Sequence, residues 1–259
     1  MLPATTTSSD SLFFEFPARA YLEKYYSHVG DENSAFLRAI ASFLLAERVP
    51  TDRVIEVGGG PSLFSLMAVA AVRQSPFRHV TFTDIGWKNL AEVECWLSDD
   101  PRQFDYEALL RWLELEVGAP PETVARALRK SRWEILNVDW HNGIPADWQG
   151  HYDVVSSHFF AESATDDEGE FIDLLWKVGR LARPGASVLL SFMCRSGGYR
   201  IGHQSFPAFS IDEDNICDYL ARAGIELAEP VVSTAPTEDP ASDPGYDGMV
   251  FVCGRLAKR

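Results

Sequence analysis

The sequence lacks the features of a nucleic-acid-binding, exported or membrane-spanning protein. Basic residues are few: 23 Lys and Arg stand against 38 Asp and Glu, and the net charge of −15 would repel a phosphate backbone. No apolar run is long enough to span a bilayer. Residues 1–10 are polar and rich in Thr and Ser, without the basic and then apolar order of a signal peptide. We therefore expect no nucleic acid and no membrane as partner.

Cysteine is also scarce, and its spacing excludes two further kinds of site. The four cysteines form no CxxC pair, so neither a zinc site nor a redox motif is indicated. No group of His, Asp and Glu has metal-ligand spacing either. Dispersed thiols are typical of a reducing compartment. We expect a cytoplasmic protein that holds no metal.

Short apolar runs alternate with amphipathic stretches from residue 53 onward. This alternation predicts right-handed βαβ units and an α/β fold with a mostly parallel seven-stranded sheet flanked by helices. The last two strands are joined by a loop rich in Pro, Asp and Gly, which is typical of an antiparallel hairpin. With 259 residues, one domain over 1–259 fits best. The predicted strands cover residues 54–57, 79–83, 133–138, 152–159, 187–192, 226–233 and 249–255.

Three segments lie outside this alternation. Residues 1–11 are interpreted as a flexible tail, and 12–50 as N-terminal helices with an apolar face. Residues 101–132, rich in Leu, Glu and Arg, are interpreted as a helical insertion after the second strand.

Two local motifs predict where helices begin. Pro61 is expected in the first turn of a helix over 63–72. Ser210 and Glu213 form a capping box that is expected to start a helix reaching Ala223.

Three glycines, Gly58, Gly59 and Gly60, end the first strand. Glycine allows a ligand to approach the backbone closely and tolerates positive φ. The motif is not the dinucleotide fingerprint, because Leu63 stands where its third glycine belongs, and no Gly-Lys-Ser/Thr of a P-loop follows. A ligand without phosphates is favoured, and S-adenosylmethionine (SAM) is such a ligand.

Acidic residues follow the next strands. In open α/β sheets, ligands bind beyond the carboxyl ends of the strands, where Glu56, Asp84, Asp139 and Glu162 fall. The Asp84 carboxylate suits the ribose hydroxyls of such a ligand, and Asp139 suits its adenine. Both Asp residues would also serve simply as loop caps, and NAD-dependent dehydrogenases share part of the pattern.

Four stretches resemble one family, the nicotinamide, phenylethanolamine and indolethylamine N-methyltransferases, over roughly residues 14–256. The first is a tyrosine motif and the second is the glycine turn. The third follows the second predicted strand and continues as a Trp-Leu-x-x-x-Pro-x-x-Phe-Asp run from Trp96 to Asp105, and the fourth follows the fifth strand. The stretches are FPARAYLEKYY (16–26), EVGGGPS (56–62), TDIGWKNL (83–90) and GYRIGHQSF (198–206).

The resemblance implies a Rossmann-like class I methyltransferase fold, with an N-terminal helical lid and a helical insertion after strand two. It implies SAM as cofactor, S-adenosylhomocysteine as product, and a small-molecule amine or N-heterocycle as acceptor. The acceptor nitrogen would attack the methyl in line, by direct displacement. By resemblance, the residues that bind SAM are Tyr21, Tyr26, Gly58, Gly59, Gly60, Phe64, Asp84, Asn89, Asp139 and Trp140.

The same resemblance places Phe159, Glu162, Ser196 and Tyr199 in the acceptor pocket, with Tyr21 and Glu162 as catalytic residues. A Glu162 carboxylate would attract a cationic amine and take its proton, directly or through water, because an ammonium has no lone pair with which to attack. From the sequence alone, Glu162 would be one member of a solvated acidic loop.

One departure from the family and three alternatives bear on the function. Phe192 stands where nicotinamide-type members have an acidic residue, which argues against nicotinamide and favours an aromatic or alkyl amine. An O- or C-methyltransferase of a small aromatic metabolite, and a non-catalytic SAM-fold binding protein, are the alternatives on the same scaffold. The absent third glycine makes an NAD-dependent oxidoreductase a remote one. We expect a monomer.

Overall fold

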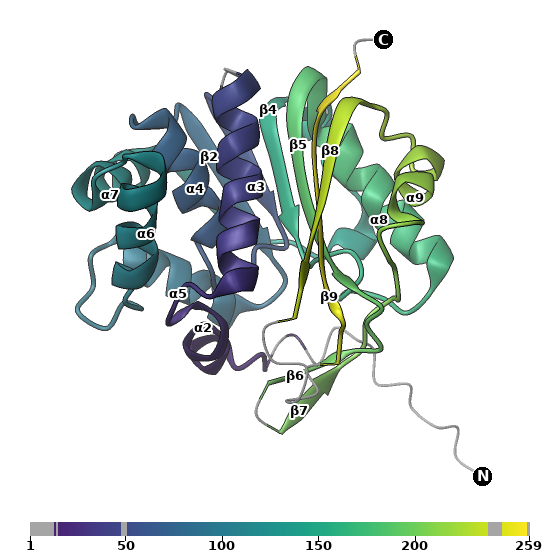
Figure 1. The fold of residues 1–259 in the computed structure, drawn as a ribbon, viewed down its shortest axis with the longest axis horizontal. Coiled ribbons are helices and arrows are strands. Elements are labelled where there is room, and N and C mark those ends of the chain that lie inside the picture. The colour runs from purple at the N-terminus through teal and green to yellow at the C-terminus, as the bar shows by residue number, and fades with distance from the viewer. Residues whose placement is uncertain (1–12, 14, 48–50, 202, 238–244, 258–259) are drawn as a thin grey trace.

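A seven-stranded sheet in the order β3-β2-β1-β4-β5-β9-β8 forms the centre of the computed structural model, which describes residues 13, 15–47, 51–201, 203–237 and 245–257 (Figure 1). The expected tail, residues 1–11, lies outside the described residues. The first five strands of this order are parallel, and β9 pairs antiparallel with both β5 and β8, so the predicted sheet and its closing hairpin are confirmed. The strands are β1 (Arg53–Val57), β2 (His79–Asp84), β3 (Trp133–Asn137), β4 (Tyr152–His158), β5 (Ala182–Cys194), β8 (Leu227–Pro236) and β9 (Gly248–Leu256).

Helices cover both faces of the sheet. One apolar core joins the first group of helices to the sheet, and a second core joins α8 and α9 to its opposite face (Figure 1). Because both faces are covered, β1, β2 and β4 are buried almost throughout, including polar residues such as Thr81 and Ser156. The first group is α3 (Asp31–Glu47), α4 (Phe64–Arg73), α5 (Trp87–Leu97), α6 (Glu107–Val117) and α7 (Pro121–Arg129); the second is α8 (Glu168–Leu181) and α9 (Ile216–Arg222). No helix in the described ranges has both the length and the apolar character needed to cross a membrane.

The strand order reverses at β1, which sets where a ligand binds. The chain runs outward from β1 through β2 to β3 and then returns to β4 on the other side of β1. Helices therefore diverge at the carboxyl ends of β1 and β4, and a crevice opens there. The glycine turn leaves β1 at this point.

Two predictions at helix starts differ from the structure. The helix expected over 63–72 spans Phe64–Arg73, but Pro61 lies in the turn before it and not in its first turn. The helix expected from Ser210 begins at Ile216, because Asp212 caps the preceding turn instead: its Oδ1 accepts hydrogen bonds from the backbone N–H groups of Asp214 and Asn215.

Two other differences concern short elements. The stretch 101–132 contains two helices, α6 and α7, because Gly118 with φ of +75° ends the first and two prolines follow. A small hairpin of β6 (Tyr199–Ile201) and β7 (Gln204–Phe206) was not predicted, since three-residue strands carry no readable periodicity.

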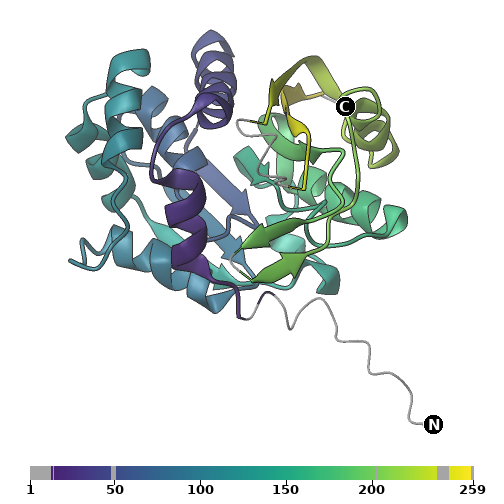
Figure 2. The same ribbon diagram turned by 60° about the horizontal axis from the view of Figure 1, so that its bottom comes forward.

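The N-terminal helix α2 (Ala18–Tyr26) and the β6–β7 hairpin lie at the same end of the sheet (Figures 1 and 2). An aromatic cluster joins them: the Phe206 ring centroid lies 5.2 Å from that of Phe16 and 5.0 Å from that of Tyr199. Arg19 fixes α2 to α5 by donating two hydrogen bonds to the Glu92 carboxylate, at 3.0 and 2.6 Å. Segments about 180 residues apart in sequence thus meet beyond the carboxyl ends of the strands.

Candidate active site

The glycine turn after β1 has the conformation that glycine permits. Gly58 and Gly60 both have φ of +60°. A Cβ on Gly58 would lie 2.2 Å from the Phe160 ring, so the absent side chain is what lets this ring approach. A Cβ on Gly60 would meet no described atom within 4 Å, so the backbone there borders open space. The turn therefore offers a ligand direct access to the main chain.

Asp84, the last residue of β2, ties this turn to the next helix. Its Oδ2 accepts a hydrogen bond from the Gly60 N–H at 2.8 Å, and its Oδ1 accepts from the Gly86 N–H at 2.7 Å and from Asn89 Nδ2 at 2.9 Å. Burial raises the pKa of Asp84, and these three donors oppose that rise. The carboxylate thus shapes the turn as well as bordering the space that the turn opens on.

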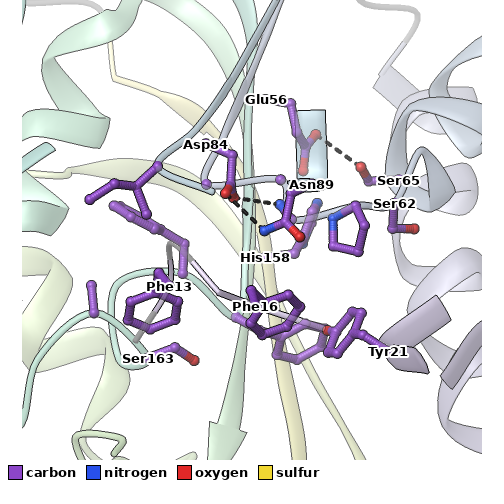
Figure 3. Close-up of a pocket in the computed structure, with 18 of the residues that line it drawn as sticks. Phe13, Phe16, Tyr21, Glu56, Ser62, Ser65, Asp84, Asn89, His158 and Ser163 are labelled. Atoms are coloured by element: carbon purple, nitrogen blue, oxygen red, sulfur yellow. Dashed lines mark hydrogen bonds between the residues drawn. The ribbon is translucent and has the colours of Figure 1, made fainter. Parts of the chain in front are cut away.

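A first cavity lies at the crevice, with a volume of about 980 Å³ that includes space open to solvent. Figure 3 shows Asp84 and Asn89 on one side of it, with Phe13, Phe16 and Tyr21 facing them across it. Every residue predicted to bind SAM lines this cavity: Tyr21, Tyr26, Gly58, Gly59, Gly60, Phe64, Asp84, Asn89, Asp139 and Trp140.

These residues fit an adenosine-containing ligand without phosphates. Asn89 lines the cavity and is 3% exposed, and its Oδ1 has no hydrogen-bond partner among the described residues. An amide oxygen of this kind accepts from a ribose hydroxyl. Asp139 and Trp140 form another part of the wall. Asp139 also caps its own loop, accepting from the His141 N–H at 2.9 Å, so the loop-cap interpretation holds together with the lining role.

A second cavity, of about 670 Å³ including open space, adjoins the first. Five residues line both cavities: Tyr21, Tyr26, Phe159, Ser163 and Tyr199. Tyr21 and Tyr199 are phenols whose pKa burial raises well above its usual value, so both keep their protons at neutral pH. Phe159 and Tyr199, predicted in the acceptor pocket, are thus on the wall between the two spaces.

Glu162 and Ser196, also predicted in the acceptor pocket, lie behind its wall. Both are fully buried, and neither is among the described residues that line the two cavities. The Ser196 hydroxyl accepts from the Gly198 N–H at 3.1 Å and donates to the Gly198 carbonyl at 3.3 Å, within its own turn. The solvated-loop interpretation of Glu162 is wrong, since no part of it is exposed.

Glu162 nevertheless acts on the cavity electrostatically. Its Oε1 accepts from the Met193 N–H at 3.0 Å, while its Oε2 has no partner among the described residues. Burial raises the pKa of Glu162 from 4.5 to about 8, against the opposing effect of the Met193 hydrogen bond. Its charge contributes to the raised pKa values of Tyr21 and Tyr199. The carboxyl therefore lies within electrostatic range of the shared wall.

Two residues whose pKa burial shifts also line the first cavity and had no predicted role. Glu56, two residues before Gly58, is 2% exposed and accepts a hydrogen bond from Ser65 Oγ at 2.9 Å. Burial raises its pKa to about 7. Its place at the end of β1 was the sequence signal. Burial lowers the pKa of His158 to about 3, so this imidazole is neutral and bridges the hydroxyls of Ser156 and Ser191, at 2.8 Å each.

Phe192 does not line either cavity. It is 2% exposed and packs against Phe171 of α8, while its neighbour Met193 lines the second cavity. The apolar wall expected on this side is therefore formed by Met193.

A glycine turn after β1, an acidic residue ending β2 and a sheet in which the antiparallel β9 lies between β5 and β8 are features of the class I SAM-dependent methyltransferase fold. A SAM-dependent methyltransferase from Clostridium acetobutylicum has the same fold, with a TM-score of 0.57 at 10% identity, over 93% of this chain and 97% of that one. Residues 4–256 match the NNMT/PNMT/TEMT family. The chain belongs to this family of SAM-dependent N-methyltransferases.

Individual relatives are similar over most of their length. Nicotinamide N-methyltransferase of Homo sapiens is 27% identical over 258 residues, which cover 94% of this chain and 95% of the relative. Phenylethanolamine N-methyltransferase of Rattus norvegicus is 25% identical over 227 residues, which cover 83% and 78%.

Proposed function

We propose that the methyl acceptor is a small-molecule amine that binds in the second cavity and meets SAM at the wall shared with the first. The observation that carries this proposal is that Tyr21, Tyr26, Phe159, Ser163 and Tyr199 line both spaces. A ligand on each side would bring a nitrogen and a methyl group together at these residues. An aromatic or alkyl amine suits the side chains there, since three of the five are tyrosines and one is phenylalanine.

SAM supplies a methyl group that its cationic sulfur has already activated. The chain then has to bind, orient and exclude water. Asp84 and Asn89 would hold the adenosine, Asp139 and Trp140 would lie at the adenine, and the glycine turn with Phe64 would contact the methionine part. The acceptor nitrogen attacks in line, and its approach is fixed by the shared wall.

Glu162 would take the proton that the acceptor amine must lose, through water, because it lies behind the wall. A pKa of about 8 suits a group that exchanges protons near neutral pH. A cationic amine in the cavity would favour the charged carboxylate and lower this pKa, which prepares Glu162 to accept the proton that the amine releases. Tyr21, on the shared wall, would position the nitrogen.

The N-terminal segment would act as the lid. Phe16 and Tyr21 line the first cavity from the α2 side, and their rings are 5.2 Å apart. The protein would act as a monomer. The four free cysteines favour a reducing, cytoplasmic setting.

Methyl transfer to a panel of amines and a matched panel of phenols tests the proposal. We expect transfer to at least one amine class and to no phenol. Transfer to phenols alone would support the O-methyltransferase alternative, and the absence of SAM binding by calorimetry would overturn the SAM site itself. Glu162→Gln should lower kcat on the best amine by about 10²- to 10⁴-fold, the range for loss of a general base, with little change in SAM affinity. Full activity in this variant would refute the role of Glu162.

A further inference from the structure

The second cavity contains a buried carboxylate that the proposed function does not use. Glu32, in the first turn of α3, lines this cavity and is 8% exposed. It is the single carboxylate among the described residues that line the cavity, and it does not line the first cavity. Tyr246 also lines the second cavity only, and its hydroxyl donates a hydrogen bond to Glu32 Oε2 at 3.3 Å.

Two neighbouring features place favourable partial charges at the Glu32 carboxylate. The N-terminus of a 17-residue helix stabilises a negative charge in its first turn. Burial, and next the charge of Glu32, raise the pKa of Tyr246 far above its ordinary value, so the phenol stays protonated and remains a donor to the carboxylate. A carboxylate on the wall of a largely buried cavity is a partner for a cationic ligand.

Aromatic faces in the same cavity suit the same kind of ligand. Tyr21, Tyr25, Tyr26 and Tyr199 line it together with Tyr246. The ring of Tyr25 already has a cation near it, since Lys24 Nζ lies 4.6 Å from its centroid. Lys24 and His28 also line this cavity, but Lys24 is exposed and its ammonium already donates to the Arg200 carbonyl at 2.9 Å. Tyrosine rings and a carboxylate together are a recognised arrangement for an ammonium group.

We infer that Glu32, with Tyr246, binds a second cationic group on the acceptor, remote from the nitrogen that is methylated. The inference rests on the proposed function for the place of the reacting nitrogen. That nitrogen must be neutral when it attacks, at the wall shared with the first cavity. Glu32 lies on the unshared part of the wall, where a permanently protonated group forms the stronger pair. The acceptor class is therefore a diamine or an amine with a second basic group.

Paired acceptors of one skeleton test this directly. 1,6-Diaminohexane is compared with hexylamine, and 4-(aminomethyl)benzylamine with benzylamine, after correction for the two equivalent nitrogens. In at least one pair the wild-type protein should prefer the diamine by about 10- to 100-fold in kcat/KM, the range for one charge-assisted contact. No preference in either pair, or a preference for the monoamine, would overturn the inference, whatever the behaviour of any variant.

Variants then locate the effect. Glu32→Gln keeps the shape and removes the charge, so the preference should fall to about twofold or less, mainly through KM for the diamine. Asp31→Asn is the matched control: it removes one charge from the neighbouring, exposed residue of the same helix and should keep the preference. Tyr246→Phe removes the donor to Glu32 and should change the preference severalfold, which covers the case in which Glu32→Gln fails to fold. A preference that survives in Glu32→Gln would overturn the inference.

Binding separates this inference from the proposed function. Each acceptor is titrated calorimetrically into protein saturated with S-adenosylhomocysteine. This measures the contribution of Glu32 to acceptor affinity without any methyl transfer. Tighter diamine binding that Glu32→Gln abolishes, in a protein that methylates no amine, would sustain the inference and overturn the proposed function. Amine methylation without a diamine preference that depends on Glu32 would sustain the proposed function and overturn the inference.

Discussion

Replacing Glu162 with Gln should make the folded protein more stable at neutral pH, although the variant is expected to be a poorer enzyme. Gln keeps the Oε1 acceptor for the Met193 N–H, so the one observed hydrogen bond of this side chain survives. What disappears is the ionisable group. Folding raises the pKa of Glu162 from 4.5 to about 8 through burial, so the folded state favours the protonated acid while the unfolded state favours the ionised one at neutral pH.

The direction and size of the effect follow from this difference. Below pH 4.5 the acid is protonated in both states, and Glu162 makes no pH-dependent contribution. As the pH rises from 4.5 to 8, the unfolded state gains its charge first and the folded state is progressively disfavoured; above 8 the penalty is constant. At about 1.36 kcal/mol per pH unit the full penalty is about 5 kcal/mol, and at pH 7 it is about 3 kcal/mol.

Urea unfolding of both proteins between pH 4 and 9 measures this difference. The free energies of unfolding should agree near pH 4 and diverge above it, with the variant about 3 kcal/mol more stable at pH 7, or roughly 6–12 °C higher in Tm. Glu114→Gln, on the exposed side of α6, is the control and should leave the difference from wild type independent of pH. Parallel curves for wild type and Glu162→Gln would refute the buried, protonated state of Glu162.

Three further perturbations test the site. Gly58→Ala should destabilise the fold by about 2–4 kcal/mol, because its Cβ would lie 2.2 Å from the Phe160 ring at a φ of +60°. Gly60→Ala has the same φ but borders open space, so it should cost about 1 kcal/mol. Equal losses of stability in urea titrations of the two variants would contradict this. Asp84→Ala removes an acceptor of three hydrogen bonds and should weaken SAM binding by about 100-fold or more by calorimetry, so unchanged affinity would exclude a role in the site. Arg19→Gln removes the charge that pairs with Glu92 and fixes α2 to α5. It should weaken SAM binding by about two- to tenfold and lower the free energy of unfolding by less than about 1 kcal/mol. An unchanged SAM affinity would count against α2 as a lid.

Local signals in the sequence were enough to predict the fold. The alternation of short apolar strands with amphipathic helices gave seven strands in the right places, because helices bury the central strands of the sheet on both faces. Capping was less readable. Ser210 and Glu213 have the spacing of a capping box, but Asp212 competes for the same turn and the helix begins at Ile216. Short side chains that can bond several nearby N–H groups make such choices depend on the tertiary context.

The residues of the SAM site were predictable for a different reason. The glycines, Asp84, Asp139 and Trp140 lie at or just after strand ends, and the topology of an α/β sheet brings the carboxyl ends of its parallel strands to one crevice. The residues of the helices, Tyr21, Tyr26, Phe64 and Asn89, were predicted from the family resemblance instead. Gly58, Asp84 and Asp139 line one cavity as expected. The sequence thus determined the class of fold, the family and the side of the sheet where the cofactor site lies.

Only the tertiary structure determined which acidic residues lie at or behind the wall of the second cavity. Sequence similarity placed Glu162 in the pocket wall, while the fold buries it behind that wall, and burial sets its pKa. Glu32 carried no local signal at all, because its cavity neighbour Tyr246 is 214 residues away and approaches only when α3 packs beside the last strands. Desolvation and long-range contact depend on which distant segments meet, and no local pattern of residues specifies either of them.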